Sequence, residues 1–362
     1  MRVAILSVSN NGKLLSKKLK SLLTNDPTII RIDTFHKNVK KNINYIFNEY
    51  DVIIGIMATG ILIRNICKNI DNKYNDPAIL SIDEKGKFVI SLLSGHMGGA
   101  NQFTKKIANL LSAKAVITTA TDIHGKLGID ILANHFYWNI INKKNVLTFN
   151  KALLEDEILH LKSNSNTIKY IEEFFSNNTL EINEGEKQNN STKNIDRITE
   201  DNYNYILNID ESFSNKIIAK FQDIELELKP RKLVVGIGSR KNISEKHVLL
   251  AIDRVIGNLG IFPKRIDCLA TVSIKKNESG IFKASETLNK PLIIIEKEEI
   301  GDFYNSNISK DCSKSSFVKE KFGIYGVSEA CAMISSGKGS KLVHKKIALN
   351  GVTVAVAISK QI

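Results

Sequence analysis

The sequence predicts an α/β protein: two α/β modules with mostly parallel sheets, joined by a small variable middle domain. Short apolar runs alternate with helical patterns over residues 1–137 and again over residues 231–362. Continuous apolar strands between helices are typical of a parallel sheet covered on both faces. The chain of 362 residues is also longer than one hydrophobic core usually supports. Residues 138–230, by contrast, are acidic and nearly free of glycine.

Three domains are therefore expected. They are an N-terminal α/β domain at 1–137, an acidic middle or linker domain at 138–230, and a C-terminal α/β domain at 231–362.

The first domain alternates predicted strands and helices, which indicates a doubly wound α/β arrangement. The expected strands are Arg2–Val8, Asp51–Met57, Ala78–Asp83, Phe88–Leu92 and Ala115–Thr119. The expected helices are Lys13–Leu23, which follows a turn at Asn10–Gly12, a helix that carries Arg64, and Asn101–Leu111.

The middle segment is expected to form a small connecting domain with the least chemistry. Helical pieces are predicted around Lys151–Lys162 and Ile168–Phe175, and a short strand at Tyr203–Ile209. Ser176–Asp196, crowded with Asn, Glu, Lys and Ser, is predicted to be a mobile loop or linker.

The α/β pattern restarts in the last segment, after Pro230. The predicted strands are Lys232–Gly238, Ile266–Ser273, Pro291–Ile295 and Gly351–Ile358. The predicted helices are Ser244–Leu259, with Ser244 as a candidate N-cap, and Val327–Ile334.

The net charge of +13 is spread unevenly over these segments. It is +8 over residues 1–137, −5 over 138–230 and +10 over 231–362. A basic electrostatic field raises the local concentration of anionic partners. A general bias of the composition toward Lys, Asn and Ile explains the positive charge equally well. There is no Arg-rich stripe and no basic run interleaved with aromatic residues, so nucleic acid is not expected as a partner.

Membrane and metal chemistry are not indicated either. No apolar stretch approaches the ~18 residues of a membrane span, and the amino-terminal residues are typical of a first strand rather than a signal peptide. We expect a cytoplasmic protein. The four cysteines show no C-x-x-C spacing and the histidines are scattered, so we expect reduced, mostly buried thiols and no protein metal site.

The loop Ser94–Asn101 combines three glycines with Ser, His and Asn, directly after a predicted strand. Glycine lets the backbone approach a ligand closely, and the N–H groups at a following helix start can bind an anion. His96 is a candidate general acid or base, or else a side chain bonded within a tight turn. Ser94 is a weak nucleophile candidate because the G-x-S-x-G elbow is absent. The substrate-contacting residues expected here are Ser94, Gly95, Gly98, Gly99 and Asn101.

Two further loops are expected at the same sheet edge, where α/β folds bind ligands. Thr119, Thr121 and Asp122 end the next predicted strand, and Asp122 either holds His96 or caps a helix. The third loop contributes Thr59, Gly60 and Arg64. Arg64 offers a bidentate carboxylate clamp, or is an ordinary surface arginine.

The second glycine loop, Gly236-Ile237-Gly238, resembles the start of a dinucleotide fingerprint without its third glycine, so a dinucleotide is not expected. Arg240 and Lys241 instead place positive charge at a helix entrance, suited to anions. Lys275 and Glu278 lie just beyond a strand. Glu329 is either an acid/base residue or a carboxylate favoured by a helix N-terminus. Gly236, Gly238, Arg240, Lys241, Lys275 and Glu278 are expected to contact the substrate.

These residues resemble the cobalt-precorrin-5A hydrolase family (CbiG), which acts in the anaerobic route to cobalamin. Val89–Asn101 and Val116–Asp122 resemble its N-terminal part. The matches to its C-terminal domain are Gly236–Arg240, Leu269–Glu278, Ser316–Val318, Gly326–Ala330 and Gly351–Ala357. Segment order and the variable middle agree, so the resemblance spans nearly the whole chain.

The chain departs from the family pattern at three positions. Family members often carry Cys where Ser239 stands, Asp near Ser273 and Pro where Ala330 stands. These three residues are therefore poor candidates for essential chemistry.

The resemblance implies a reaction. The substrate is a cobalt-bearing corrinoid whose lactone ties an acetate side chain to the meso carbon left by ring contraction. Water opens the lactone and a two-carbon fragment leaves as acetaldehyde, giving cobalt-precorrin-5B. His96 is then the expected proton-transfer residue, with oxyanion-stabilising N–H groups from Gly98 and Gly99.

The resemblance also implies partners and cofactors. Arg64, Arg240, Lys241 and Lys275 would hold the carboxylate arms of the substrate. The expected partners are this small-molecule polycarboxylate corrinoid and neighbouring pathway enzymes. Cobalt would arrive with the substrate, and no further cofactor is expected.

The sequence leaves two other function classes open. A non-catalytic carrier of a corrinoid intermediate would keep the basic segments and glycine loops without needing His96, and acetaldehyde release separates it from the hydrolase. A nucleotide-binding enzyme is disfavoured by the incomplete fingerprint and the absence of G-x-x-x-x-G-K-[ST].

Overall fold

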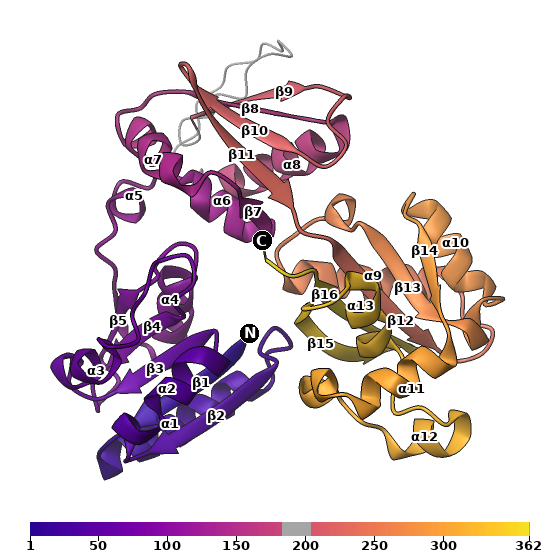
Figure 1. Cartoon of the computed structure of the whole chain (residues 1–362), viewed down its shortest axis with the longest axis horizontal. Coiled ribbons are helices and arrows are strands. Elements are labelled where there is room, and N and C mark those ends of the chain that lie inside the picture. The colour runs from indigo at the N-terminus through magenta and orange to yellow at the C-terminus, as the bar shows by residue number, and fades with distance from the viewer. Residues whose placement is uncertain (183–203, 362) are drawn as a thin grey trace. The chain divides into compact units, whose positions relative to one another are not determined.

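The computed structural model describes residues 1–182 and 204–361. The chain forms two compact units, Met1–Ile123 and His124–Ile362 (Figure 1). The α/β class predicted from the sequence is confirmed. The domain boundary expected at residue 137 lies earlier, because Phe136 stacks on Trp138 of the second unit with ring centroids 5.1 Å apart. The middle and C-terminal segments, expected as separate domains, form one unit.

The first unit is built around a six-stranded sheet with the order β2-β1-β3-β4-β5-β6. Its strands are β1 (Arg2–Ser7), β2 (Arg31–His36), β3 (Val52–Ile56), β4 (Ala78–Ile82), β5 (Phe88–Leu93) and β6 (Lys114–Val116). Its helices are α1 (Asn10–Thr24), α2 (Val39–Glu49), α3 (Thr59–Ile66), α4 (Ala100–Leu111) and α5 (Ala120–Ile123).

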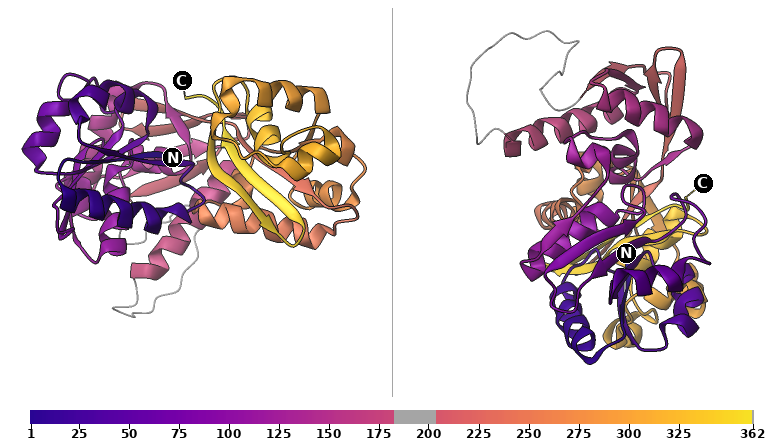
Figure 2. Two further views of the ribbon diagram at one scale, coloured as in Figure 1. Left: turned by 90° about the horizontal axis from the view of Figure 1, so that it is seen from below. Right: turned by 90° about the vertical axis from the view of Figure 1, so that its left-hand side faces the viewer.

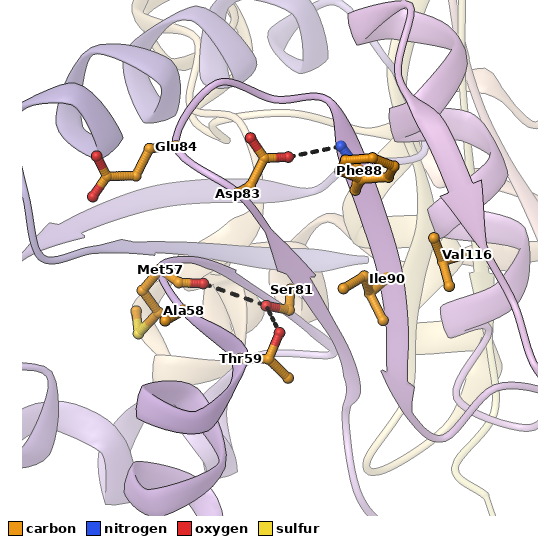
Figure 3. A pocket seen from close by; sticks show the side chains of 9 residues that line it. All are labelled: Met57, Ala58, Thr59, Ser81, Asp83, Glu84, Phe88, Ile90 and Val116. Atoms are coloured by element: carbon orange, nitrogen blue, oxygen red, sulfur yellow. Dashed lines mark hydrogen bonds between the residues drawn. The ribbon is translucent and has the colours of Figure 1, made fainter.

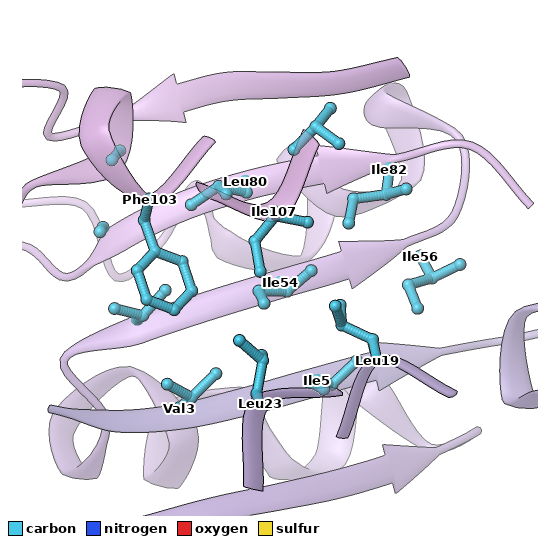
Figure 4. Packing of buried hydrophobic residues seen from close by; sticks show 14 of the residues in the cluster. Val3, Ile5, Leu19, Leu23, Ile54, Ile56, Leu80, Ile82, Phe103 and Ile107 are labelled. Carbon is cyan, nitrogen blue, oxygen red and sulfur yellow. The ribbon is translucent and has the colours of Figure 1, made fainter. Parts of the chain in front are cut away.

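Helices cover both faces of this sheet, as a doubly wound domain requires. On one face, Leu19 of α1 and Ile107 of α4 pack over Ile54 of β3 (Figure 4). On the other face, Ile46 of α2 and Leu62 of α3 belong to a second apolar cluster. Successive strand residues point to opposite faces, so a strand buried on both sides is apolar throughout.

The sheet is mostly parallel, as expected, with one reversal of strand direction. β1, β2, β3 and β4 run parallel, but β5 is antiparallel to β4, and β6 is parallel to β5. A short hairpin makes this reversal. The Asp83 carboxylate accepts hydrogen bonds from the backbone N–H groups of Lys85 (2.9 Å), Lys87 (2.8 Å) and Phe88 (2.7 Å). Side-chain to backbone bonds of this kind are typical of Asp in turns.

Three elements near the amino terminus differ from expectation. The predicted turn at Asn10–Gly12 is the first turn of α1, capped by Ser9, whose hydroxyl accepts from Gly12 N at 3.0 Å. β2 was missed because it is an edge strand with few buried residues and no apolar run. α2 was missed although its buried residues follow helical spacing; they are Val39, Ile43, Ile46 and Phe47.

The middle part of the second unit contains a five-stranded sheet with the order β7-β11-β10-β8-β9. Its strands are β7 (Trp138–Ile140), β8 (Leu159–Ser163), β9 (Tyr205–Ile209), β10 (Ile217–Phe221) and β11 (Ile224–Pro230). Its helices are α6 (Ile129–His135), α7 (Val146–Leu154) and α8 (Ser165–Ile182). The described pairings are antiparallel except between β8 and β9.

Two predictions for this part need correction. The helix expected over 151–162 ends at Leu154, and β8 follows it with strictly alternating burial, which is the period of a strand. The polar segment 176–196 begins inside α8, which extends to Ile182, and its remainder lies outside the described residues.

The C-terminal part contains a mixed sheet with the order β14-β13-β12-β16-β15. Its strands are β12 (Leu233–Ser239), β13 (Cys268–Val272), β14 (Leu292–Ile295), β15 (Lys341–Leu349) and β16 (Val352–Ile358). Its helices are α9 (Glu245–Asn258), α10 (Ser279–Thr287), α11 (Lys297–Asn305), α12 (Ser316–Phe322) and α13 (Ser328–Ser336). Short 3-10 helices lie at Lys143–Asn145, Pro263–Arg265, Ser273–Lys275 and Asn307–Asp311.

Strand direction again departs from a parallel sheet. β12, β13 and β14 are parallel, whereas β16 is antiparallel to β12 and pairs with β15 as a long hairpin (Figure 2). β15 was not predicted, because its lysines and its shifts of register after Leu342 and His344 break the apolar alternation. Ser244 precedes α9 as expected, but its side chain makes no capping bond.

A buried arginine joins the two sheets of the second unit. Arg265 is 2% exposed; its guanidinium donates to Phe136 O (2.8 Å) and Arg231 O (2.6 Å) and pairs with Asp267 at 2.9 Å. Asp267 in turn accepts from Leu233 N at the start of β12 (2.6 Å). A buried charge is tolerated only when it is paired and hydrogen-bonded, so these bonds hold the two parts in one arrangement.

All four cysteines are free thiols. Cys268 and Cys331 are buried, Cys312 is partly buried and Cys67 is exposed. Among the described residues, no helix combines the length and apolar character that crossing a bilayer requires.

The β4–β5 hairpin gives a first prediction. Asp83→Ala removes the acceptor of three backbone N–H groups, so we expect the first unit to lose about 1–3 kcal/mol of stability. Urea unfolding followed by amide hydrogen exchange in β5 measures this loss. The only tryptophan, Trp138, lies in the second unit, so its fluorescence transition should not move.

The matched control is Glu84→Ala, which truncates the exposed neighbouring carboxylate. Equal protection of β5 amides in both variants would contradict the assigned role of Asp83.

Candidate functional site

The loop between β5 and α4 is held by its own backbone. The N–H groups of Gly99, Ala100 and Asn101 donate to the carbonyls of His96 (3.0 Å), Ser94 (3.1 Å) and Gly95 (3.0 Å). A methyl group on Gly98 would lie only 2.5 Å from Ser94 Cβ and 2.8 Å from Ser94 O, so no other residue fits there without movement. The glycines thus let the chain fold back tightly on itself.

Ser94 occupies an unusual conformation. Its φ of 57° is left-handed, a region that side-chain-bearing residues seldom adopt. Its hydroxyl is buried and makes no hydrogen bond to any described residue. Ser94 shows no base within bonding distance, and its candidacy as a nucleophile stays a prediction.

The loop directs His96 toward the end of β6, where Thr121 and Asp122 lie. His96 Nε2 is 3.2 Å from Asp122 Oδ2 and 3.0 Å from Thr121 Oγ1. The predicted contact between Asp122 and His96 is therefore confirmed. The two segments meet because β5 and β6 run parallel, so their carboxyl ends share one edge.

Asn101 organises this edge. Its side-chain amide donates to Asp122 Oδ2 (2.7 Å) and to Thr119 Oγ1 (3.0 Å), and its carbonyl oxygen accepts from Ser91 Oγ (2.6 Å). Asn101 is 3% exposed, so its hydrogen-bonding groups are directed by protein partners rather than by bulk water. An amide that holds both the carboxylate and a hydroxyl fixes where Asp122 points.

The environment of Asp122 keeps it ionised. Burial opposes the charge, but hydrogen bonds from His96 and Asn101 and the Lys105 ammonium at 3.3 Å outweigh it and lower the pKa of the carboxyl. The His96 and Asp122 side chains are each 12% exposed, while that of Lys105 is 60% exposed. The result is a partly desolvated imidazole–carboxylate pair, the arrangement that orients a histidine for proton transfer.

The oxyanion role expected of the glycines fits only in part. The N–H group of Gly99 donates a hydrogen bond to His96 O within the loop, so in this conformation it already has an acceptor. The prediction for Gly99 as a donor to substrate stays a prediction. The prediction for Gly98 stays a prediction.

Thr59, Gly60 and Arg64 lie elsewhere. They follow β3, and because β5 runs antiparallel to β4, the carboxyl ends of β3 and β5 are at opposite edges of the sheet. Their expected grouping with the Ser94 loop was therefore wrong. Arg64 is exposed.

A cavity of about 440 Å³ marks that opposite edge (Figure 3). Its lining residues are Met57, Ala58, Thr59, Ser81, Asp83, Glu84, Phe88, Ile90 and Val116. Its two hydroxyls, Thr59 Oγ1 and Ser81 Oγ, bond to each other at 3.0 Å, as Figure 3 shows. Most of the remaining lining is apolar, so the cavity offers little to an anionic ligand.

The second glycine loop is used for packing. A Cβ on Gly236 would lie 1.9 Å from Ser328 O of α13, and one on Gly238 would lie 2.6 Å from Thr353 Oγ1. Both glycines are buried. Gly236 allows α13 to approach β12 closely, and Gly238 leaves space for Thr353 of β16 and for Val327.

The basic residues after this loop lie at one sheet edge. Arg240 and Lys241 are exposed beyond β12, and Lys275 follows the parallel strand β13. Lys275 Nζ is 3.3 Å from Glu278 Oε2, while Glu278 Oε1 accepts from Ile243 N at 3.0 Å. Glu278 therefore connects the loop after β12 to the loop after β13.

Glu329 has a structural environment. It is 3% exposed, and its carboxylate accepts from Ser313 N (2.7 Å), Ser313 Oγ (2.6 Å) and Lys346 N (3.1 Å). These bonds tie α13 to the preceding loop and to β15. Of the two interpretations left open for Glu329, the structure favours the structural carboxylate.

The sequence reasoning missed two members of the His96 site. Ser91 orients Asn101, and Lys105 contacts Asp122. Lys105 lies one turn after Asn101 on α4, so helical spacing could have found it, whereas Ser91 points inward only because of the strand register.

In the part of the chain that the structure describes, no three His, Cys, Asp or Glu side chains come together as candidate metal ligands.

Known families and structures match this chain along nearly its full length. The family models "Cobalamin synthesis G N-terminal" and "Cobalamin synthesis G C-terminus" match residues 41–122 and 233–357. A "Probable cobalt-precorrin-5A hydrolase" of Methanocaldococcus jannaschii is 32% identical over 369 residues, covering 99% of both chains. A "Cobalt-precorrin-5A hydrolase" of Priestia megaterium is 27% identical, covering 90% of this chain and 83% of its own.

The fold has a solved counterpart. The crystal structure of a cobalamin biosynthesis protein G homologue from Sulfolobus solfataricus aligns with a TM-score of 0.54 and 25% identity, covering 99% of this chain and 97% of that one.

The lowered pKa of Asp122 gives a second prediction. A carboxyl whose pKa falls on folding adds stability above its unfolded pKa, and this contribution is lost as the pH falls through the folded pKa. Asp122→Asn should therefore cost about 1 kcal/mol at pH 7. The difference from the wild type should shrink as the pH falls below the ordinary value of 3.8.

Urea unfolding of the first unit at a series of pH values measures this difference. A stability gap that is the same at neutral and acid pH would show that the Asp122 charge contributes nothing to folding.

Proposed function

This chain belongs to the cobalt-precorrin-5A hydrolase (CbiG) family of cobalamin biosynthesis, and we propose that it opens the lactone of cobalt-precorrin-5A and releases acetaldehyde, giving cobalt-precorrin-5B. The observation that carries the proposal within the structure is the hydrogen-bonded His96–Asp122 pair at the carboxyl ends of β5 and β6.

The chemistry requires two proton movements. Water adds to the lactone carbonyl and the ring C–O bond breaks, which leaves a carboxylic acid and an alcohol. The alcohol then loses its proton, the carbon–carbon bond to the macrocycle breaks, and acetaldehyde departs. The electron pair stays on the macrocycle carbon, which takes up a proton. One water is consumed and one acetaldehyde is released, so the reaction needs an acid/base group but no redox partner.

His96 is suited to move these protons. Because Asp122 is ionised, it can only accept a hydrogen bond, so His96 Nε2 carries the proton that faces it. We propose that the imidazole exchanges its protons with water and the substrate. Asp122 stabilises the imidazolium that results, and Asn101 keeps the carboxylate in place.

The roles of the other predicted residues follow from the substrate. The exposed Arg240 and Lys241 and the partly buried Lys275 would bind its acetate and propionate arms. Cobalt would enter as part of the substrate, with no further cofactor. We place the reaction in the cytoplasm, with neighbouring pathway enzymes as partners that deliver or receive unstable corrinoids.

The experiment that tests this function measures acetaldehyde release from cobalt-precorrin-5A under anaerobic conditions. We expect release by the wild type and a loss of about a hundredfold or more in kcat for His96→Ala, with substrate binding retained, because the proton-transfer group is gone. Asp122→Asn should lower kcat about tenfold or more, because the ring loses its orienting carboxylate.

The matched control is His36→Ala. His36 ends β2 at the opposite sheet edge and bonds Ser7 Oγ at 3.1 Å, so its loss should leave kcat within about twofold. Acetaldehyde release by His96→Ala at the wild-type rate would move the chemistry to another residue. Tight binding without release by the wild type would overturn the hydrolase function.

A further inference from the structure

The helix α12 exposes aromatic side chains without burying any residue of its own. Phe317 is 67% exposed and Phe322 is 37% exposed. A seven-residue helix gains little stability from its backbone alone, and most short helices are stabilised by packing an apolar face. The two phenylalanines of this helix therefore expose apolar surface.

Lysines accompany these rings. Lys321 Nζ lies over Phe317, 5.9 Å from its ring centroid, and over Phe322 at 5.5 Å. One ammonium thus stands between two exposed rings, on the same surface. Such a pair keeps its charge in water while the aromatic faces remain available for contact.

The same arrangement continues at Tyr325, just beyond α12. Lys319 Nζ lies 4.4 Å from its ring centroid and Lys314 Nζ lies 5.2 Å away. Lys319 also bonds the Tyr325 hydroxyl at 2.5 Å, and this bond lowers the pKa of the phenol. Three rings and three lysines therefore lie together in one short segment, 314–325.

The carboxyl-terminal end of this segment lies near residues that follow strands of the C-terminal sheet. A Cβ on Gly323 would lie 3.4 Å from Nζ of Lys297, which directly follows β14. Val327 packs against Gly238 near the end of β12. The carboxyl-terminal end of the segment and the residues after it thus lie near the carboxyl ends of β14 and β12, an edge where α/β folds bind ligands.

The charge at this edge favours an anion. Arg240, Lys241 and Lys275 lie beyond β12 and β13. Several carboxylates nearby are occupied by backbone N–H groups: Glu278 by Ile243 N, Glu299 by Glu296 N, and Glu329 by Ser313 N and Lys346 N. Glu320 is the one carboxylate on α12 itself, against Lys319 and Lys321.

We propose that the α12 face, formed by Lys314, Phe317, Lys319, Lys321, Phe322 and Tyr325, binds one flat face of the tetrapyrrole substrate together with its carboxylate arms. The inference rests on the proposed function for the identity of the substrate. Aromatic rings offer stacking area to a planar macrocycle, and the lysines between them match acetates and propionates around its rim. A protein partner would be an unusual occupant, because lysine is depleted at protein interfaces.

The test separates rings from charges. Two double variants, Phe317→Ala/Phe322→Ala and Lys319→Gln/Lys321→Gln, are titrated with uroporphyrin, a flat tetrapyrrole that carries acetate and propionate arms. We expect each variant to raise Kd about tenfold or more, since stacking and ion pairing each contribute more than about 1 kcal/mol. The loss in the lysine variant should shrink as salt rises, whereas the loss in the phenylalanine variant should persist.

The matched control is Phe213→Ala. Phe213 also has two lysines over its ring, Lys162 at 5.7 Å and Lys216 at 5.8 Å, but it lies in the middle part of the unit. Its loss should leave Kd within about twofold. Thermal unfolding should be unchanged in the phenylalanine double variant, because α12 has no buried residue to lose.

A second readout uses the natural substrate. In acetaldehyde release, both double variants should raise KM for cobalt-precorrin-5A about fivefold or more and leave kcat within about twofold, because they remove binding rather than chemistry. Kd and KM within about twofold of the wild type would overturn the inference. So would an equal loss in the Phe213 control, or binding of single-stranded oligo(dT) that is tighter than that of uroporphyrin and is lost in the same variants.

The two proposals fail differently. If the wild type releases no acetaldehyde but binds uroporphyrin through the α12 face, the hydrolase function fails and tetrapyrrole binding stands. If acetaldehyde is released normally and the double variants bind and react as the wild type does, the α12 face is not the binding surface and the hydrolase function stands.

Discussion

The hydrogen bonds of the Asp83 carboxylate to three backbone amides of the β4–β5 turn decide which loops of the first unit share an edge of its sheet. They close the β4–β5 hairpin and so reverse the chain within an otherwise parallel sheet. From that point the carboxyl ends of β5 and β6 lie at the edge opposite to those of β1, β2, β3 and β4. His96, Asn101 and Asp122 meet because of this reversal. Thr59 and Arg64 follow β3, which precedes the reversal, so they lie at the opposite edge of the sheet from His96 and Asp122.

Buried carboxylates serve two purposes in this protein, and their partners distinguish them. Glu329 is bonded by backbone amides and a serine, which hold segments together. The hydrogen bonds of Asp122 described above come from side chains. One of these side chains is the His96 imidazole, a group able to exchange a proton. The first arrangement supports the fold, while the second keeps a titratable pair in a fixed geometry for reaction.

The two glycine loops look alike in sequence but differ in use. At Gly98 the missing side chain lets the loop fold against Ser94 and direct His96 outward from the turn. At Gly236 it lets the helix α13 lie against β12, with Ser328 O filling the space. In the proposed function, anion recognition in the second unit falls to side chains beyond the strands, such as Arg240 and Lys241 and the lysines of α12. This division agrees with a substrate that is large, flat and rich in carboxylates.

Residue order alone determined the α/β class, the strands buried on both sides, and the pairing of the Ser94 loop with Asp122, because these follow from apolar periodicity and from neighbouring strands in the chain. It also contained the family resemblance that the homologues confirm. Only the tertiary structure decided strand direction, and with it the edge to which each loop belongs, since a hairpin and a crossover can carry equally apolar strands. The same holds for Gly99, whose N–H is satisfied within its own loop. It holds too for Arg265, which joins two parts expected to be separate. These outcomes depend on contacts between residues far apart in the chain, which periodicity does not encode.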